Sequence, residues 1–211
     1  ITIYSTFLQR GFDQIIHDVC LMNLPVVFAM DRAGLVGNDG ETHQGAFDIS
    51  FLRFIPNMIL FAPRDNKTLE LGLEFAYTLT SPSAIRYPRG AFPKLDFKAS
   101  KFELGKSELL KNGTSNKLFI GYGSGVSKAI EVEKLHKEDI AILDLRFVKP
   151  LDIDTLVLLS KKYDSWYIFS DSCKQGGVLS AILEALSEKN ITNISLKSLS
   201  RAINKVESLI R

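Results

Sequence analysis

Residues that could do chemistry gather in one stretch of the sequence, Asp31–Asp48, which reads DRAGLVGNDGETHQGAFD. The stretch combines Arg32, Asp39 and His43 with four glycines. A loop histidine among polar neighbours suits proton transfer or hydrogen bonding, and glycines let the backbone turn sharply or approach a ligand closely. An isolated glycine-rich loop is more often a flexible surface loop. An arginine, a carboxylate and a histidine in one loop favour a functional site.

The elements around this stretch place it at the edge of a sheet. It directly follows the apolar run Pro25–Met30, which reads as a buried strand, and open α/β sheets place ligand sites in loops that follow strands. The motif RYPRG at 86–90 ends another predicted strand. Because the ends of parallel strands meet at one edge, we expect Arg32 and Arg89 to converge there as a clamp for phosphate. A pair of surface salt bridges is the alternative.

The first half of the sequence alternates strands with helices, as their hydrophobic periodicity indicates. The predicted strands are 1–6, 26–30, 58–62 and 83–88, and the predicted helices are 7–23, 48–55 and 63–80. This order predicts a parallel sheet with crossover helices. Asp48 is expected to cap the second of these helices. Tyr4 and Phe7, at the end of the first strand, should either face the same edge as the arginines or belong to the core.

The second half repeats the alternation without repeating the sequence. Its predicted strands are 118–120, 140–145, 166–169 and 191–199, and its predicted helices are 126–136, 152–162 and 178–188. Pro93 and a mixed charged and aromatic composition indicate a linker between the halves. We therefore predict an α/β protein of two parallel-sheet units with crossover helices: a first unit at 1–92, a linker at 93–106 and a second unit at 107–211.

A second glycine cluster, Gly121–Gly125, follows a predicted strand and precedes a predicted helix, with Asp144 further along the chain. This arrangement resembles a dinucleotide-binding fingerprint, although its third glycine comes one position early. A tight turn from strand to helix explains the cluster equally well. Of the remaining histidines, His17 on the first predicted helix is expected to be a surface or structural residue, and His136, in a charged helix end, is expected to be solvated.

Composition and charge exclude several classes of protein. The net charge of +2 over 211 residues gives no reason to expect nucleic acid or an anionic membrane as a partner. No apolar run is long enough to span a membrane. Cys20 and Cys173 fit neither a disulfide framework nor a zinc motif, so reduced thiols in the cytoplasm are expected. Because the sequence opens directly on the predicted strand at 1–6, we expect a fragment that lacks an upstream part.

Taken together, the motifs closely resemble one enzyme family. They are YSTFLQR at 4–10, the stretch 31–48, PNM at 56–58, RYPRG at 86–90 and LRFVKPL at 145–151. They are similar to the 1-deoxy-D-xylulose-5-phosphate synthases, which are transketolase-like thiamine diphosphate enzymes. The resemblance implies a three-domain enzyme, of which this chain is the later part of the pyrimidine-binding domain plus the C-terminal domain. The domain that holds the diphosphate and Mg²⁺ would lie upstream, so no metal ligand is expected here.

The resemblance also assigns roles on the cofactor side of the site. It implies that the ring of Phe7 stacks against the aminopyrimidine of thiamine diphosphate and that Arg10 supports the site. His43 would be poised over the reacting carbon, where it could donate a hydrogen bond or move a proton. The glutamate that activates the aminopyrimidine would belong to the missing upstream part, so the chain is expected to be inactive alone.

On the acceptor side, the resemblance implies that Tyr4, Arg32 and Arg89 hold the phosphate of D-glyceraldehyde 3-phosphate. Asp39 would contact a hydroxyl group of the same substrate. These assignments agree with the residues that the loop and strand ends already single out. The family carries a paired acidic motif near DSCK at 171–174, where this sequence departs from it, in a segment expected to lie away from the site.

The implied reaction condenses pyruvate with D-glyceraldehyde 3-phosphate and releases carbon dioxide, which feeds the synthesis of isoprenoids, thiamine and pyridoxal. Family membership also implies a homodimer. Two alternatives remain. The chain could be part of a transketolase or a split transketolase-like subunit that uses a ketose phosphate donor. It could also be a non-catalytic remnant that binds a partner.

Overall fold

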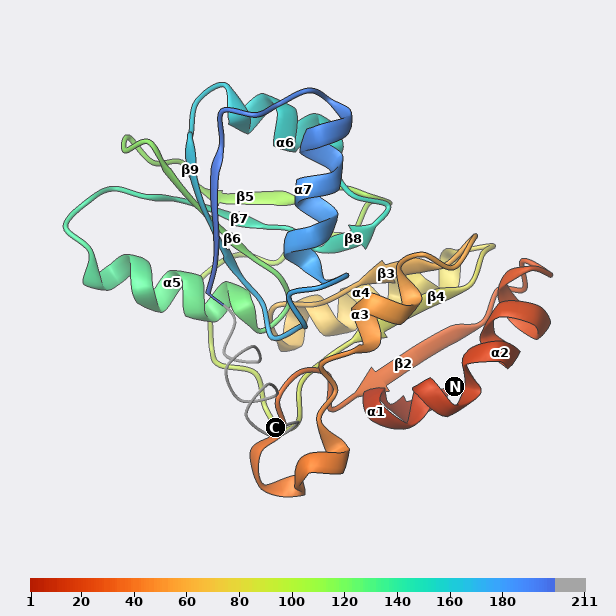
Figure 1. Ribbon diagram of the computed structural model, residues 1–211. Helices are drawn as coiled ribbons and strands as arrows, with labels where there is room; N and C mark the ends of the chain where they lie inside the picture. Colours follow the sequence, from red (N-terminus) through yellow and green to blue (C-terminus); the bar gives the residue numbers. More distant parts are fainter. Residues whose placement is uncertain (200–211) are drawn as a thin grey trace.

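Two five-stranded sheets organise the chain, and helices pack against both of them (Figure 1). The computed structural model describes residues 1–199, so the end of the predicted second unit, 200–211, lies outside the described residues. The predicted α/β class is confirmed. Within residues 1–199 no helix is long and apolar enough to cross a membrane.

The first sheet has the strand order β1-β2-β4-β3-β8. Its strands are β1 (Thr2–Tyr4), β2 (Val27–Asp31), β3 (Ile59–Phe61), β4 (Ser83–Arg86) and β8 (Phe147–Lys149). The first four pair in parallel, whereas β8 runs antiparallel to β3. The two central strands β3 and β4 are buried throughout, as expected for parallel strands covered on both faces.

The second sheet has the order β10-β9-β6-β7-β5. Its strands are β5 (Glu108–Lys111), β6 (Lys117–Gly121), β7 (Ala141–Asp144), β9 (Ser165–Phe169) and β10 (Ser195–Ser198). All pairs are parallel except β5 with β7. Both sheets are therefore mainly parallel, as predicted, and the short edge strands β5 and β8, which were not predicted, run antiparallel to their neighbours.

Five helices of the described residues, α3 to α7, lie where the sequence predicts helices. They are α3 (Asp48–Leu52), α4 (Asn66–Thr78), α5 (Gly125–Leu135), α6 (Ile153–Ser160) and α7 (Val178–Glu188). Asp65 caps α4 by accepting a hydrogen bond from the backbone N–H of Thr68. The expected cap at Asp48 is wrong, because Asp48 is the first residue of α3 and its carboxylate also accepts from Arg86.

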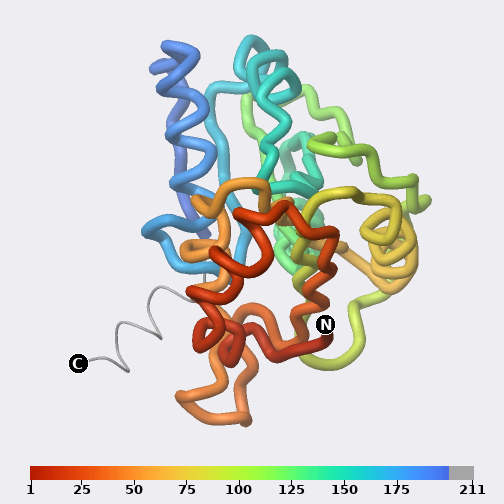
Figure 2. Tube along the Cα trace, turned by 90° about the vertical axis from the view of Figure 1, so that its right-hand side faces the viewer, coloured from red at the N-terminus to blue at the C-terminus, as the bar shows by residue number. Residues whose placement is uncertain are grey.

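The segment after β1 differs from the single helix predicted at 7–23. It consists of α1 (Ser5–Leu8), a 3₁₀ turn (Gln9–Gly11), α2 (Phe12–Gln14) and a π-helical run (Ile15–Cys20). Helical geometry thus begins at Ser5, so Phe7 lies on a helix rather than at a strand end. Figure 2 shows this segment in red, lying across the molecule as one curved run.

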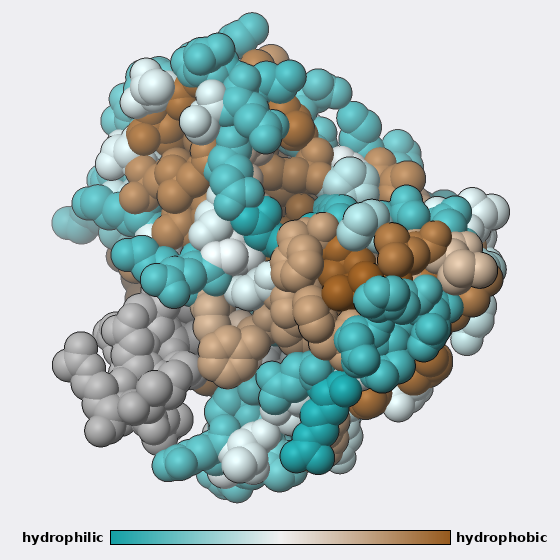
Figure 3. All heavy atoms as spheres, turned by 45° about the vertical axis from the view of Figure 1, so that its right-hand side comes forward, coloured by the Kyte–Doolittle hydropathy of each residue, from teal (hydrophilic) through white to brown (hydrophobic). Residues whose placement is uncertain are grey.

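One hydrophobic core joins the two units. Buried side chains of both sheets belong to the same cluster, which includes Met30 and Leu60 from the first sheet and Leu118 and Ile168 from the second. The molecule also exposes several large apolar side chains, and Figure 3 shows such hydrophobic areas at its surface. Met22, Ile1 and Phe54 are the most exposed among those of the first unit that precede α4.

Two buried arginines fasten the segment between the units. Arg64 donates to the carbonyl of Lys98 at 3.1 Å and to the carboxylate of Asp144 at 2.9 Å, and it also pairs with Glu108. Arg146 donates to the carbonyl of Lys101 at 3.0 Å and pairs with the same Glu108. Part of the segment predicted as a linker is therefore held firmly against both units.

Candidate functional site

Three predicted site residues meet at the carboxyl edge of the first sheet. Because β2 pairs in parallel with β4, the loops that follow them leave the sheet side by side. The Nε atom of Arg32 lies 2.8 Å from Oδ2 of Asp39, and the Nε atom of Arg89 lies 3.2 Å from the same oxygen. The two arginines therefore converge on one carboxylate, which carries the charge that a bound anion would supply.

Arg32 is also held from its other sides. It donates to Oδ2 of Asp31 at 2.9 Å, and its guanidinium carbon lies 3.9 Å from the centre of the Tyr4 ring. Its backbone adopts the left-handed conformation, with φ of 56°, which turns the chain sharply after β2. The hydrogen bond to Asp39 raises the pKa of Arg32, and the same bond, with the charges of Arg89 and His43 nearby, lowers the pKa of Asp39.

An aromatic group lies next to the charged one. The rings of Tyr4 and Phe7 stack with their centres 5.4 Å apart and an angle of 12° between their planes. His43 meets Phe7 edge-on at 5.3 Å, and its Nδ1 lies 3.0 Å from Oγ1 of Thr42. Because 41% of the Phe7 surface is exposed, part of this aromatic group remains open to a ligand.

The loop 32–45 is closed at its base and braced inside. Gly34 and Gly45 exchange two backbone hydrogen bonds, of 2.7 and 2.8 Å. A Cβ on Gly45 would lie 2.3 Å from the carbonyl oxygen of Arg32, so only glycine fits there. Gln44 bridges the loop by accepting from the N–H of Val36 and donating to the carbonyl of Gly40. In Figures 1 and 2 the loop projects from the sheets as an orange trace.

Arg10 does not join this group. It lies exposed in the 3₁₀ turn that follows α1, and its guanidinium makes no hydrogen bond or ion pair with the part of the chain that the structure describes. The structure thus brings together six of the predicted site residues and leaves the seventh apart. The six are Tyr4, Phe7, Arg32, Asp39, His43 and Arg89.

Sequence reasoning missed a buried ionic group beneath the loop. Arg86 is 2% exposed and donates from Nε to Asp48 at 2.9 Å and from Nη1 to Asp171 at 3.0 Å. Burial alone would lower the pKa of Arg86, but the two carboxylates outweigh it and raise that pKa. A signal was available, because an arginine at the end of a buried strand needs a buried counter-charge.

The segment DSCK at 171–174 was expected to lie away from the site, and this expectation is wrong. A Cβ on Gly34 would lie 1.9 Å from Oδ2 of Asp171, so that carboxylate packs directly against the site loop. The backbone N–H of Cys173 also donates to the carbonyl of Ala46 at 3.0 Å. The second unit therefore contacts the loop that carries Arg32, Asp39 and His43.

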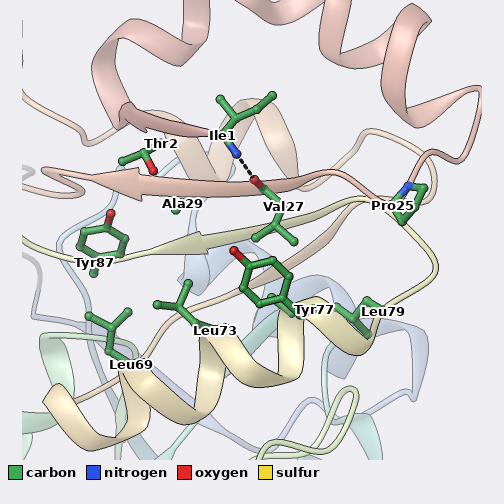
Figure 4. A pocket seen from close by; sticks show the side chains of 11 residues that line it. Ile1, Thr2, Pro25, Val27, Ala29, Leu69, Leu73, Tyr77, Leu79 and Tyr87 are labelled. Carbon is green, nitrogen blue, oxygen red and sulfur yellow. Dashed lines mark hydrogen bonds between the residues drawn. The ribbon is translucent and has the colours of Figure 1, made fainter.

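A separate pocket of about 660 Å³ lies between α4 and strands β1 and β2 (Figure 4). Its walls are mainly aliphatic and aromatic, with Leu69, Leu73 and Tyr77 of α4 facing Val27 of β2. None of the predicted site residues lines it, so it is not the candidate site. In residues 1–199 no group of three or more His, Cys, Asp or Glu side chains is arranged to hold a metal ion.

Comparison with protein families identifies both units. The transketolase pyrimidine-binding domain matches residues 1–94, and the transketolase C-terminal domain matches residues 105–206. Among solved structures, a split-gene transketolase described as an inactive β4 tetramer has a TM-score of 0.84 and is 26% identical in sequence. That match covers 94% of this chain and 66% of the other.

Two curated relatives with higher identity carry the same name. A 1-deoxy-D-xylulose-5-phosphate synthase of Aliarcobacter butzleri is 76% identical over 198 residues, which are 94% of this chain and 33% of the relative. The synthase of Sulfurimonas denitrificans is 59% identical, and the match covers 93% of this chain and 33% of that protein. The chain thus spans about a third of the length of these relatives. The two domain matches and these identities show that the chain belongs to the 1-deoxy-D-xylulose-5-phosphate synthase family of transketolase-like proteins.

Proposed function

We propose that this chain forms part of a 1-deoxy-D-xylulose-5-phosphate synthase and carries the acceptor site of that enzyme. The whole enzyme would condense pyruvate with D-glyceraldehyde 3-phosphate and release carbon dioxide. The observation that carries this proposal is the convergence of Arg32 and Arg89 on Asp39, next to the Tyr4 and Phe7 rings. The identity of 76% to a named synthase supports the same reading.

The charges of the clamp explain how it would receive a phosphate. Arg32 and Arg89 are balanced by Asp31 and Asp39, so the group is neutral without a ligand. Both arginines direct Nε toward the same oxygen of Asp39. A phosphate would offer them several oxygens in place of one, in the geometry that guanidinium forks match. Asp39 would then be free to accept a hydrogen bond from a hydroxyl of the bound acceptor.

The aromatic group fits the pyrimidine ring of thiamine diphosphate. Phe7 presents an exposed ring that is backed by Tyr4, which is the arrangement that a flat heterocycle needs for stacking. When bound, the cofactor supplies the stabilised carbanion chemistry that removes carbon dioxide from a 2-oxo acid. Arg10 would support this side of the site from the 3₁₀ turn. The diphosphate and Mg²⁺ would be bound by parts of the enzyme that this chain does not include.

His43 would hold and move a proton at the reacting centre. Its Nδ1 is engaged by the hydroxyl of Thr42, whereas its Nε2 makes no hydrogen bond within the described part of the chain. The ring lies against Phe7, so we expect Nε2 to be available to an oxygen of the substrate when the cofactor is bound. The charge-neutral clamp and this histidine together define the acceptor and proton-transfer sides of one site.

The remaining properties of the enzyme are proposed on the family alone. They are a homodimer, a cytoplasmic location, and products that feed isoprenoid, thiamine and pyridoxal synthesis. The chain by itself is expected to be inactive, since it spans about a third of its relatives. The transketolase alternative is supported by one observation, the likeness to a split-gene transketolase with a TM-score of 0.84. Its identity of 26% is far below the 76% shared with a synthase.

Product analysis of the complete gene product tests this proposal. With thiamine diphosphate and Mg²⁺, one reaction contains pyruvate and D-glyceraldehyde 3-phosphate, and a second contains xylulose 5-phosphate and an aldose acceptor. Deoxyxylulose phosphate and carbon dioxide in the first reaction alone are the expected result. Ketol transfer in the second reaction alone would identify a transketolase instead. No product in either, from protein that binds thiamine diphosphate, would favour a non-catalytic role.

A further inference from the structure

One buried arginine contacts the segments that carry the candidate site. Arg86 ends β4 and leads directly into the turn that carries Arg89. Its Nε donates to Oδ2 of Asp48, the first residue of α3 after the site loop. The same oxygen accepts from the hydroxyl of Ser5 at 3.0 Å. Ser5 is the neighbour of Tyr4 in the chain. Through a single carboxylate, Arg86 therefore connects the strand end, the site loop and the start of α1.

The same arginine reaches the second unit. Its Nη1 donates to Oδ1 of Asp171, whose other oxygen accepts from the hydroxyl of Ser124 at 3.0 Å. Oδ2 of Asp171 also packs against Gly34 in the site loop. The carboxylates of Asp48 and Asp171 thus lie on either side of one guanidinium, and they come from different units of the chain.

This arrangement fixes positions rather than binding a ligand. The side chains of Arg86 and Asp48 are 2% and 0% exposed, so neither can reach a substrate in the loop above. A planar guanidinium directs its hydrogen bonds in set directions, whereas an ammonium group at the same place acts as a single point of charge. In a buried setting, a change in these directions moves the attached segments, because no water can replace the lost bonds.

We propose that Arg86 is the positioning residue of the candidate site, coupling the C-terminal unit to the phosphate clamp through Asp171 and Asp48. The geometry that it sets is the distance between Arg32 and Arg89 across Asp39. This inference rests on the proposed function for its kinetic readout. It concerns a residue that touches neither substrate nor cofactor.

The kinetic test compares two lysine variants in the complete gene product. R86K keeps the positive charge and loses the planar guanidinium group with its paired donors. R64K is the matched control, because Arg64 is fully buried and also pairs with carboxylates of the second unit. In R86K we expect the KM for D-glyceraldehyde 3-phosphate to rise at least about tenfold, because misplacing a binding group by about 1 Å costs up to the order of 100-fold. The KM for pyruvate should stay within about twofold of its original value.

R64K should unfold at a temperature lowered as much as in R86K, with both KM values unchanged. Equal changes of both KM values in R86K, or the same KM change in R64K, would show that Arg86 only stabilises the fold. If R86K does not fold, Ser124→Ala takes its place, because it removes only the bond to Asp171. A rise in the KM for the phosphate substrate alone is expected there too, and its absence would overturn the proposal.

Hydrogen exchange separates this inference from the proposed function. The amides of Gly34 and Gly45 bond to each other's carbonyls, so their exchange reports whether the base of the loop is closed. We expect faster exchange in the peptides that cover 31–48 in R86K than in R64K, whatever reaction the protein catalyses. Equal protection in the two variants would refute the positioning role even if the protein proved to be a synthase.

Discussion

Replacement of Arg89 by alanine is the most direct test of the phosphate clamp. Arg89 is the more exposed of its two arginines, with 49% of its side chain accessible against 21% for Arg32. Its ion pair within residues 1–199 is the one with Asp39, at 3.2 Å. Its removal should therefore affect the clamp without unfolding the sheet, because no buried group loses its partner.

The expected size of the effect follows from this exposure. A hydrogen bond to a charged group contributes about 1.5–3 kcal/mol, and a half-exposed arginine belongs at the lower end of that range. A loss of about 1.5–2 kcal/mol corresponds to a rise of roughly 10- to 30-fold in the KM for D-glyceraldehyde 3-phosphate. The KM for pyruvate should change by less than about twofold, since pyruvate carries no phosphate.

Steady-state kinetics with each substrate varied in turn measures both constants. Arg89→Lys should fall between the original enzyme and Arg89→Ala, because lysine keeps the charge and loses the fork. Lys94→Ala is the control for general electrostatics, since Lys94 is exposed in the same stretch of chain and has no ion pair in the described residues. A similar rise in both KM values, or an equal effect of Lys94→Ala, would refute the clamp.

The remaining predictions concern turnover, loop geometry and acid stability. His43→Ala should lower kcat on the order of 100-fold or more with little change in either KM, and an unchanged kcat would remove His43 from proton transfer. Gly45→Ala should abolish acceptor binding, because its Cβ would lie 2.3 Å from the carbonyl oxygen of Arg32, whereas Gly37→Ala meets no atom within 4 Å and should cost only about 1 kcal/mol of backbone strain. Burial would raise the pKa of Asp152, but hydrogen bonds from Ser107 and Thr155 outweigh it and lower that pKa. Because the pKa of Asp152 is lower in the folded protein, its carboxylate stabilises the fold at pH values above about 3.9, which is the pKa of an aspartate in the unfolded chain. This stabilisation is lost as the pH falls through the pKa of the folded state. Urea unfolding should therefore show Asp152→Ala about 1–2 kcal/mol less stable at pH 7, with a difference that shrinks in acid; a difference that persists in acid would contradict this.

The sequence predicted most elements of the fold because their patterns are local. The strands β2, β3 and β4 are short apolar runs bounded by turn residues, and α7 begins and ends where its periodicity indicates. The two missed strands, β5 and β8, have no such pattern. Each is an edge strand whose pairing depends on a partner elsewhere in the chain. Their antiparallel direction is set by that partner and cannot be inferred from their own residues.

The site was predictable where it follows from topology. Parallel pairing of β2 with β4 is enough to bring Arg32 and Arg89 to one edge. The role of Asp39 as their common counter-charge was not predictable, because it depends on how the loop 32–45 folds back. The pairing of Arg86 with Asp171 spans the two units, and no local spacing signals a contact across that distance in the chain.

The shared oxygen of Asp39 bears on how the proposed enzyme would tell its two substrates apart. Both substrates are anions, but pyruvate carries a carboxylate and D-glyceraldehyde 3-phosphate a phosphate. A carboxylate entering the clamp would exchange one carboxylate for another and gain little, because Asp39 already satisfies Arg32 and Arg89. A phosphate carries more charge and more oxygens, so it can engage both arginines at once and displace Asp39. The carboxylate of Asp39 would thus prevent pyruvate from binding to Arg32 and Arg89. In Asp39→Asn this competing charge is absent, so pyruvate should become a competitive inhibitor against the phosphate substrate. Unchanged competition in Asp39→Asn would mean that selection occurs elsewhere in the enzyme.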